Sequence, residues 1–323
     1  MILNHLVLCI CTRNRPDYVQ TFLDGLVGLA FIPKVCVVVD SSDNLTTKNL
    51  VEVFSSTSPI RCDYLYSLPG LPHQRNTGIN YLQSLPVVDD DDIISFLDDD
   101  VAIRRDYFKQ VSELFDENPN AICVGGYLED HPKKGVASLF RRMMMLESKD
   151  SGKILKSGLT TPPIPSVRAM RTQWVQGGMQ NYRMHVFRHQ LFDGRVRMYG
   201  EDVEFQLRIN KYGEFLCSNA LPVRHLKASS EKEGVRSEQS FTDGFRWSLA
   251  QKQLVGVTRR AVISSTIIIS ILEALLFIIC FDRTRLQRLL GHLDFLYKVI
   301  FRIDPQQYVS HEGSGPLPSN PIG

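Results

Sequence analysis

The sequence predicts an α/β protein built on a mostly parallel sheet and followed by a helical C-terminal region. Over residues 6 to about 126, short apolar runs rich in β-branched residues alternate with segments of helical apolar spacing. An apolar segment of 21 residues stands near the C-terminus, at residues 261–281. The 323 residues are 43% hydrophobic and 22% charged with a net charge of +2, which is typical of a globular protein and gives no support for a nucleic-acid partner.

The first unit along the chain is a strand, a helix and a second strand. Residues 6–11 and 35–40 are the predicted strands, and Pro16 stands near the start of the helix between them. Further strands at residues 93–97 and 121–124 flank another helical pattern. Strands that alternate with helices predict a parallel sheet with helices on both faces.

The second half of the chain is less regular. Residues 149–173 carry three prolines in four positions and predict a loop. A helix then opens after Gly200, and an apolar stretch ends at His225. We divide the chain into residues 1–230 as the α/β domain, 231–310 as a helical region and 311–323 as a Gly-, Pro- and Ser-rich tail, expected to be disordered.

Seven aspartates lie in twelve positions, on both sides of the strand at residues 93–97. Residues 89–92 precede the strand and are expected to form a solvated turn. Asp98, Asp99 and Asp100 follow it, at the end where open α/β sheets bind ligands. Adjacent carboxylates repel one another, and a divalent cation with a preference for oxygen ligands, Mg²⁺ or Mn²⁺, would neutralise them.

Basic and acidic side chains elsewhere are typical of an anion-binding site. Asp40 closes the second strand, where a carboxylate commonly binds ribose or base. Residues 12–16, TRNRP, offer backbone N–H groups and two guanidinium groups near a helix start. Arg75 precedes a further helical pattern, where it either meets a diphosphate or is a surface arginine.

The helix after Gly200 begins with two acids, Glu201 and Asp202. Acids stabilise a helix start in any protein. If Asp202 faces the site it is a candidate general base, because Glu201 opposes the lowering of its pKa by the helix dipole. His225 is either a metal ligand or an ordinary partly buried histidine.

The segments CTRNRP, VVVDSSDN, QRNTGI, FLDDDV, GGMQNYR and FDGRVRMYGEDVEFQLR, with the later His225, occur in the order and spacing of a known family. Over about residues 5–226 the chain resembles family 2 glycosyltransferases with the GT-A fold. The resemblance implies metal-dependent transfer of a sugar, with inversion, from a nucleoside diphosphate sugar, with Mn²⁺ or Mg²⁺ as the cofactor. It assigns nucleotide binding to Thr12, Arg13, Asp40, Arg75 and Asp98, metal binding to Asp100 and His225, the base to Asp202, and donor or acceptor sugar contacts to Asp99, Gly178, Arg183 and Glu201.

Other functions stay open at this point. The segment ISFLDDDV also resembles the nucleophile motif of haloacid dehalogenase phosphatases. A sugar nucleotidyltransferase would need a Gly-rich loop after the first strand, which the chain lacks, and a non-catalytic sugar-nucleotide binder would keep the fold alone. No QxxRW motif follows Asp202, so transfer of a single sugar is expected.

Residues 261–281 contain a single charge, Glu273, and would form a helix about 31 Å long. Arg259 and Arg260 precede the segment and Arg283 follows it. Three placements stay open: a spanning helix, a helix in the plane of the membrane interface, and a buried helix. We expect a cytoplasmic protein at the inner face of the cell membrane that makes cell-surface polysaccharide or glycolipid from a glycan or lipid-linked acceptor.

Overall fold

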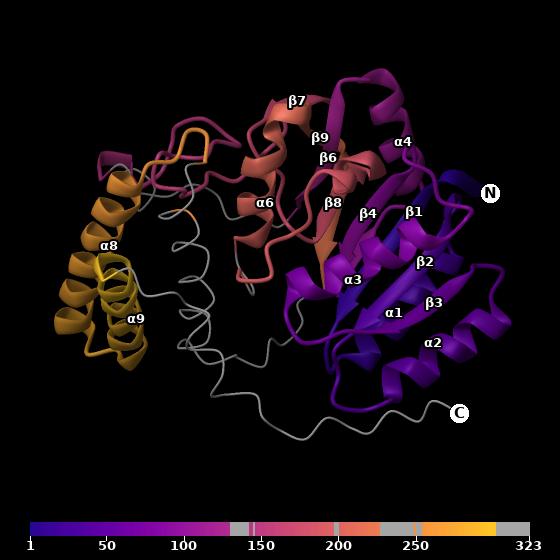
Figure 1. Ribbon diagram of the computed structural model, residues 1–323, viewed down its shortest axis with the longest axis horizontal. Helices are drawn as coiled ribbons and strands as arrows, with labels where there is room; N and C mark the ends of the chain where they lie inside the picture. The colour runs from indigo at the N-terminus through magenta and orange to yellow at the C-terminus, as the bar shows by residue number, and fades with distance from the viewer. Residues whose placement is uncertain (130–141, 145, 197–199, 227–248, 250–253, 302–323) are drawn as a thin grey trace.

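The computed structural model describes residues 1–129, 142–144, 146–196, 200–226, 249 and 254–301. Within them it contains a 9-stranded sheet with strand order β3-β2-β1-β4-β8-β6-β9-β5, and β7 pairs with β9 (Figure 1). The strands are β1 (Ile2–Thr12), β2 (Ile32–Asp40), β3 (Cys62–Tyr66), β4 (Ile93–Asp98), β5 (Val101–Ile103), β6 (Ala121–Leu128), β7 (Met170–Thr172), β8 (Met179–Arg183) and β9 (Glu214–His225).

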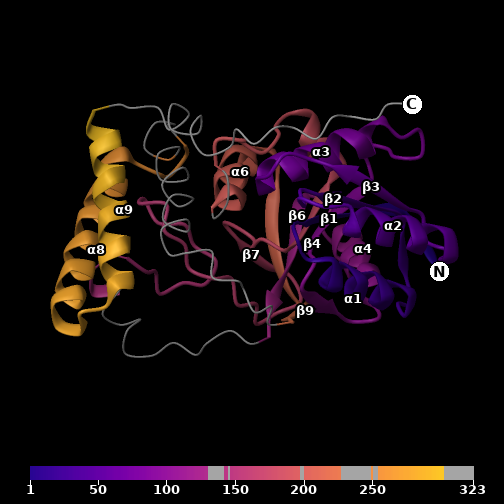
Figure 2. The same ribbon diagram turned by 90° about the horizontal axis from the view of Figure 1, so that it is seen from below.

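Helices cover both faces of this sheet, as Figure 2 shows. On one face α1, α2 and α4 bury their apolar stripes, and on the other α3, α6 and η1 do so. The helices are α1 (Pro16–Val27), α2 (Thr46–Thr57), α3 (Leu71–Ser84), α4 (Tyr107–Glu117), α6 (Glu201–Ile209), α8 (Arg259–Cys280) and α9 (Arg283–Ile300), with 3₁₀ turns η1 (Met184–Arg188) and η2 (Asn210–Tyr212). The predicted fold class, an α/β protein with a mostly parallel central sheet and C-terminal helices, is confirmed.

The parallel part of the sheet brings four strand ends together. β3, β2, β1 and β4 run in the same direction, so their carboxyl ends lie at one edge. In the ladder Thr12 is the partner of Asp40, and Cys11 is the partner of Asp98. The two groups of aspartates at residues 89–92 and 98–100 therefore stand at opposite ends of β4.

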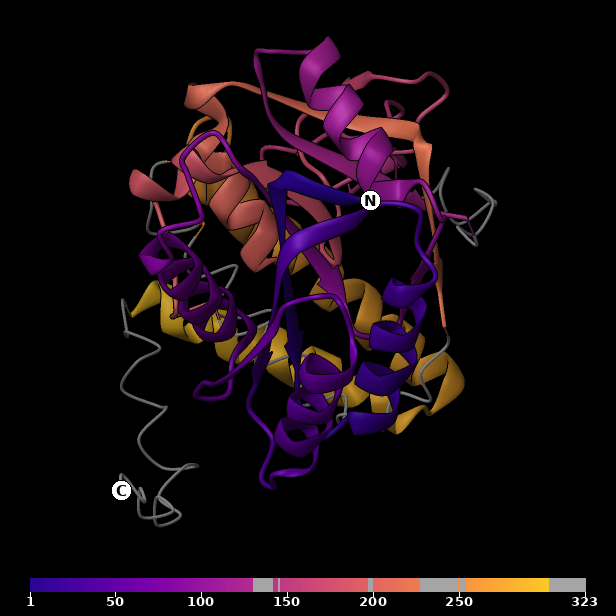
Figure 3. The same ribbon diagram turned by 90° about the vertical axis from the view of Figure 1, so that its right-hand side faces the viewer.

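α8 and α9 form a hairpin that lies at one end of the molecule, beyond α6 (Figures 1 and 3). It is attached at its base, where Val262 of α8 and Phe295 and Val299 of α9 share an apolar cluster with Val203 and Leu207 of α6. The expected helical region begins within residues that the structure does not describe, and the tail at residues 311–323 also lies outside the described residues.

The antiparallel strand β8 is fastened by one buried amide. Asn181 accepts a hydrogen bond from the Ser95 hydroxyl of β4 at 2.6 Å and donates one to the Val124 carbonyl of β6 at 2.9 Å. It also donates to the Tyr107 hydroxyl at 3.3 Å. All four side chains are buried in the core, so the amide joins three strands through bonds that water cannot replace.

Asn181→Leu is therefore expected to lower the free energy of unfolding by about 1–3 kcal/mol for each buried partner left without a hydrogen bond. Thermal or urea unfolding measures the change. Asn219, exposed on β9, provides the control Asn219→Leu. Equal loss of stability in the two variants would contradict this role.

Candidate active site

The loops that follow β1 and β4 meet through side-chain hydrogen bonds. The Thr12 hydroxyl donates to Asp99 Oδ2 at 2.6 Å, and both side chains are buried. Asp40, the neighbour of Thr12 in the ladder, is also buried, and its carboxylate accepts hydrogen bonds from Ser42 and from the Tyr64 hydroxyl. Three of the predicted nucleotide and sugar residues thus lie together at one edge of the sheet.

A guanidinium group stands between two of the aspartates. Arg15 Nη1 lies 3.2 Å from Asp99 Oδ1 and 3.1 Å from Asp100 Oδ2. Its side chain is 38% exposed, whereas the two carboxylates are buried. Arg15 belongs to the TRNRP segment, although the sequence did not single it out. It supplies the positive charge that adjacent carboxylates require.

His225, the last residue of β9, lies beside Asp100. The pairing of β5 with β9 places His225 opposite Val101, directly after the aspartates. His225 Nε2 lies 3.4 Å from Asp100 Oδ1. Residues 125 positions apart in the chain are therefore neighbours.

Asp98, the last residue of β4, lies beside the turn at Gly178 that precedes β8. Its backbone N–H donates to the Gly178 carbonyl at 3.2 Å. Gly178 has φ +77°, and a Cβ there would stand 2.2 Å from Asp98 Oδ2, so no side chain fits at this position. Desolvation by burial raises the pKa of Asp98 to about 6, against the opposing effect of Arg75.

Arg75 on α3 is buried among carboxylates, so the surface alternative for this residue is wrong. Its side chain is 2% exposed and donates to Glu201 Oε1 at 2.9 Å. Its guanidinium also lies over the rings of Phe96 and Phe192. Burial acts to lower its pKa, but Glu201 above all, with Asp98 and Asp202, raises the pKa above the usual arginine value.

Asp202 stands at the start of α6 beside the turn at Gly177. Its Oδ2 accepts a hydrogen bond from the Gly177 N–H at 2.9 Å, and its Oδ1 accepts one from the Val203 N–H. Desolvation by burial, and then the charge of Glu201, raise the pKa of Asp202 to about 7. A carboxylate with this pKa is suited to take up a proton near neutral pH.

Two predicted residues do not join this group. Arg183 pairs with Ile93 at the start of β4, the end opposite to Asp98. Its guanidinium donates to the carbonyls of Ala121 and Phe115. The expected sugar contact by Arg183 is therefore wrong, because the strand direction carries this residue away from the site. Arg13 lies at the rim, half-exposed and 3.9 Å from Asp43.

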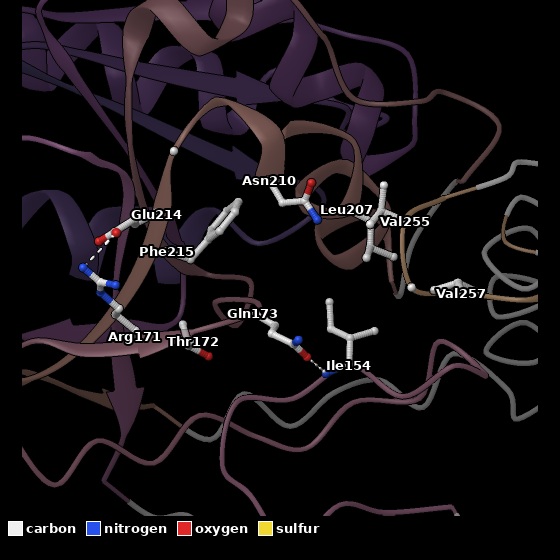
Figure 4. A pocket seen from close by; sticks show the side chains of 12 residues that line it. Ile154, Arg171, Thr172, Gln173, Leu207, Asn210, Glu214, Phe215, Val255 and Val257 are labelled. Atoms are coloured by element: carbon white, nitrogen blue, oxygen red, sulfur yellow. Dashed lines mark hydrogen bonds and ion pairs between the residues drawn. The ribbon is translucent and has the colours of Figure 1, made fainter.

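A cavity of about 500 Å³ lies elsewhere, between α6, β7, β9 and the segment that precedes α8 (Figure 4). The Arg171–Glu214 ion pair lies on one side of it, and Gln173 accepts a hydrogen bond from the Ile154 N–H on another. It contains none of the predicted site residues, and it stands at the start of β9, whereas His225 ends that strand. We therefore place the chemistry at the aspartates.

Two side chains of the candidate site, Asp100 and His225, are close enough to share one divalent ion. Among the described residues no three His, Cys, Asp or Glu side chains form a metal-binding group. Asp100 and His225, however, face each other at 3.4 Å, close to the separation of about 3 Å between adjacent ligands of one octahedral ion. Mg²⁺ is commonly held by one or two carboxylates and completed by substrate phosphates.

The raised pKa of Asp98 predicts a pH-dependent stability. Unfolded Asp98 has a pKa of about 3.9, so the folded state binds more protons between about pH 4 and pH 6, and stability falls as pH rises through this window. Asp98→Asn removes this cost. We expect its melting temperature in EDTA to exceed that of the wild type by more at pH 8 than at pH 4.5.

The control is Asp116→Asn, at an exposed position on α4. If Asp98→Asn and Asp116→Asn change the melting temperature equally at both pH values, the burial cost at Asp98 is not the cause.

Comparison with known proteins agrees with this architecture. Residues 7–193, more than half of the chain, match the model of the family described as glycosyl transferase family 2. Rhamnosyltransferase WbbL of Escherichia coli strain K12 is 23% identical over 245 residues, which cover 75% of this chain and 89% of that protein.

A solved structure shows the same fold. The chain is similar to the S. aureus TarS 1–349 fragment in complex with UDP-GlcNAc, with a TM-score of 0.53, 13% identity and coverage of 91% of this chain and 81% of that one. A mannosyltransferase from Pyrobaculum calidifontis, in complex with GDP-Man and Mn²⁺, aligns with a TM-score of 0.49, 13% identity and coverage of 97% and 76%. The family match decides between the transferase and the phosphatase alternatives: this chain belongs to glycosyl transferase family 2 and is a glycosyltransferase of the GT-A fold.

Proposed function

We propose that this enzyme transfers one sugar from a nucleoside diphosphate sugar to an acceptor hydroxyl, with inversion, and that Asp202 is the general base. The observation that carries the proposal is the position of Asp202, buried at the start of α6 beside Arg75 and with a pKa raised to about 7. An acid held in this way accepts the acceptor's proton as the hydroxyl attacks.

The proposed reaction replaces one bond at the anomeric carbon of the sugar by another and moves one proton. The bond between the anomeric carbon and the diphosphate oxygen breaks, and a bond from the acceptor oxygen forms on the opposite face of the sugar. The acceptor's proton passes to Asp202, and the electron pair stays on the leaving diphosphate. Arg75 and the basic loop after β1 favour this negative charge by electrostatic attraction.

The nucleotide would lie along the edge formed by β1, β2 and β4. Thr12 and Asp40 adjoin in the ladder and Asp98 follows in β4, which supports base and ribose contacts there. Arg13 at the rim is open to a phosphate. Asp99, Gly178 and Glu201 would lie next to the donor or acceptor sugar. Gly178 leaves room for the Asp98 carboxylate, and Glu201 forms an ion pair with Arg75.

A divalent ion, Mn²⁺ or Mg²⁺, would be held by Asp100 and His225. When bound, it supplies a positive charge for the diphosphate of the donor. Arg15 occupies the adjacent position between Asp99 and Asp100. An ion between Asp100 Oδ1 and His225 would share this carboxylate with Arg15, which lies on Oδ2, so the two cations would compete for it. A guanidinium that leaves Asp100 is suited to bind a phosphate oxygen.

Each of the two main parts of the chain would have its own role in this function. Residues 1–230 would be the catalytic domain and residues 231–310 a region that associates with the inner face of the cell membrane. A glycan or lipid-linked acceptor in cell-surface polysaccharide or glycolipid synthesis fits such a location. The similarity to a protein named as a rhamnosyltransferase makes rhamnose the first donor sugar to test.

The test is a thermal-shift screen with UDP-, GDP- and dTDP-sugars, activated rhamnose among them, with and without Mn²⁺. We expect one donor to raise the melting temperature only when Mn²⁺ is present, because a ligand that binds the folded state stabilises it. No shift with any donor would contradict the proposal.

Asp202→Asn is expected to abolish sugar transfer and to keep the donor-induced thermal shift, because it removes the base and keeps most of the shape. Asp106→Asn, at a half-exposed position before α4, is the matched control and should transfer normally. Asp202→Asn with normal transfer would exclude Asp202 as the base.

Arg15→Ala leaves the buried carboxylates of Asp99 and Asp100 without their cation. We expect a lower melting temperature in EDTA than for the wild type, and a larger rise on addition of Mn²⁺, because the ion no longer competes with a guanidinium. Arg13→Ala, in the same loop but at the rim, is the control. The same Mn²⁺-induced rise in wild type and Arg15→Ala would contradict competition between Arg15 and the ion.

A further inference from the structure

The α8–α9 hairpin has a polar seam on its inside. The buried residues of α8 recur at helical spacing, and four of the five are Ser265, Thr266, Ser270 and Glu273. Glu273 lies 3.1 Å from Arg285 and 4.0 Å from Arg288, both on α9. The hydroxyl groups of the seam donate to carbonyls of the preceding turn of α8. The buried polar side chains of α8 are therefore satisfied within the hairpin.

The outside of the hairpin is apolar. On α8 the side chain of Ile271 is 55% exposed and that of Ile279 is 73% exposed. This polarity is the reverse of that of a helix pair in a water-soluble protein. The other exposed apolar residues of the hairpin are Ile267, Leu275, Leu276, Ile278, Phe281, Leu290, Leu293, Tyr297, Ile300 and Phe301.

The sheet domain does not cover this face. The apolar cluster that fastens the hairpin uses Val262, Phe295 and Val299, which lie at its base, whereas the exposed isoleucines of α8 continue toward the tip. Figures 1 and 2 both show the hairpin at the end of the molecule, with α6 as the nearest of the labelled helices that cover the sheet. A large exposed apolar face of this kind marks a contact surface.

The charges around the face match an anionic lipid surface. Arg259 and Arg260 stand at the start of α8 and Arg283 at the start of α9, so both ends of the hairpin carry arginine. α8 has one 18-residue window of mean hydropathy 2.5, enough by length and composition to enter hydrocarbon. Apolar helices bordered by basic residues bind bilayers that contain anionic lipids.

The Glu273 ion pairs decide how the hairpin lies. If α8 crossed the membrane alone, Glu273 would lose Arg285 and Arg288 and enter hydrocarbon as an unpaired acid. If both helices crossed, the charges of α9, among them Asp294 and Lys298, would cross with them. Only when the hairpin lies parallel to the surface do the ion pairs stay intact while the charges of α9 remain outside the hydrocarbon.

We infer that α8 and α9 form an in-plane membrane-binding hairpin, with the outer face of α8 in the acyl layer of an anionic leaflet. The polar seam stays between the helices, and the arginines at the two ends contact lipid phosphates. The hairpin holds the α/β domain beside the bilayer without crossing it.

Vesicle flotation of the full chain tests this inference. We expect flotation with vesicles of phosphatidylcholine and phosphatidylglycerol, weaker flotation with phosphatidylcholine alone, and about a tenfold loss of binding in the double variant Ile271→Asp, Ile279→Asp. Val53→Asp, at a residue on α2 that is 63% exposed, is the matched control and should float as the wild type does. Unchanged flotation of the double variant, or equal flotation with neutral vesicles, would overturn the inference.

Depth measurements distinguish the in-plane hairpin from a spanning helix. Ile267→Trp and Ile278→Trp place tryptophan on one face of α8, about 16 Å apart along its axis. Quenching by brominated lipids, corrected for the wild-type signal, should report one shared depth. Depths that differ by most of this separation would overturn the in-plane arrangement.

The donor-induced thermal shift of the double variant separates this inference from the proposed function. We expect it to equal the wild-type shift, which also shows that the variant folds. If the wild type does not bind vesicles and is instead a dimer in light scattering that the double variant breaks, the face joins two copies of this chain and the inference is wrong.

Discussion

The site depends on an imbalance of charge at one edge of the sheet. Among the described residues there, Asp98, Asp99, Asp100, Glu201 and Asp202 stand against two guanidinium groups, those of Arg75 and Arg15. Arg75 of α3 is paired with Glu201 of α6 and lies near Asp98 and Asp202, which we call the inner group. Arg15 is paired with Asp99 and Asp100, the outer group. Buried carboxylates with too few cations favour protonation and positively charged ligands.

The same imbalance separates two tasks in space. The inner group, with Asp98 and Asp202, has raised pKa values because burial disfavours its ionised forms. The outer group, with Asp99 and Asp100, is paired with Arg15, which an ion and a diphosphate would displace in the proposed function. In the proposed function, one edge of the sheet would therefore hold a proton acceptor and a cation side by side, as transfer from a nucleoside diphosphate sugar would use them.

The sequence predicted the long buried strands, because apolar periodicity reports burial directly. It did not predict the short strands β5 and β7, and β7 lies within residues 149–173, which were expected to form a loop. Residues 35–40 and 93–97 lie within β2 and β4, and the acids Asp40 and Asp98 close these strands. It failed for Arg183, because proximity in a motif does not tell which end of an antiparallel strand a residue occupies. It also failed to single out Arg15, since an arginine on a loop gives no sign of which of several carboxylates it will meet.

The position of the C-terminal helix relative to a membrane could not be predicted from its composition either, because it depends on contacts with another helix. The apolar composition of residues 261–281 is compatible with a spanning, an in-plane and a buried helix. The choice between them depends on the ion-pair partners of Glu273, which lie on the following helix. Tertiary contacts of a single acid carry information that the hydropathy of its own segment lacks.

The left-handed turn at Gly178 has a consequence for how this enzyme can change. Any added methyl group there would collide with the Asp98 carboxylate, so the floor of the site is closed to substitution from β8. A substitution that alters which sugar this enzyme accepts would therefore have to lie elsewhere, in the loops around the rim, and leave the backbone at Gly178 in place.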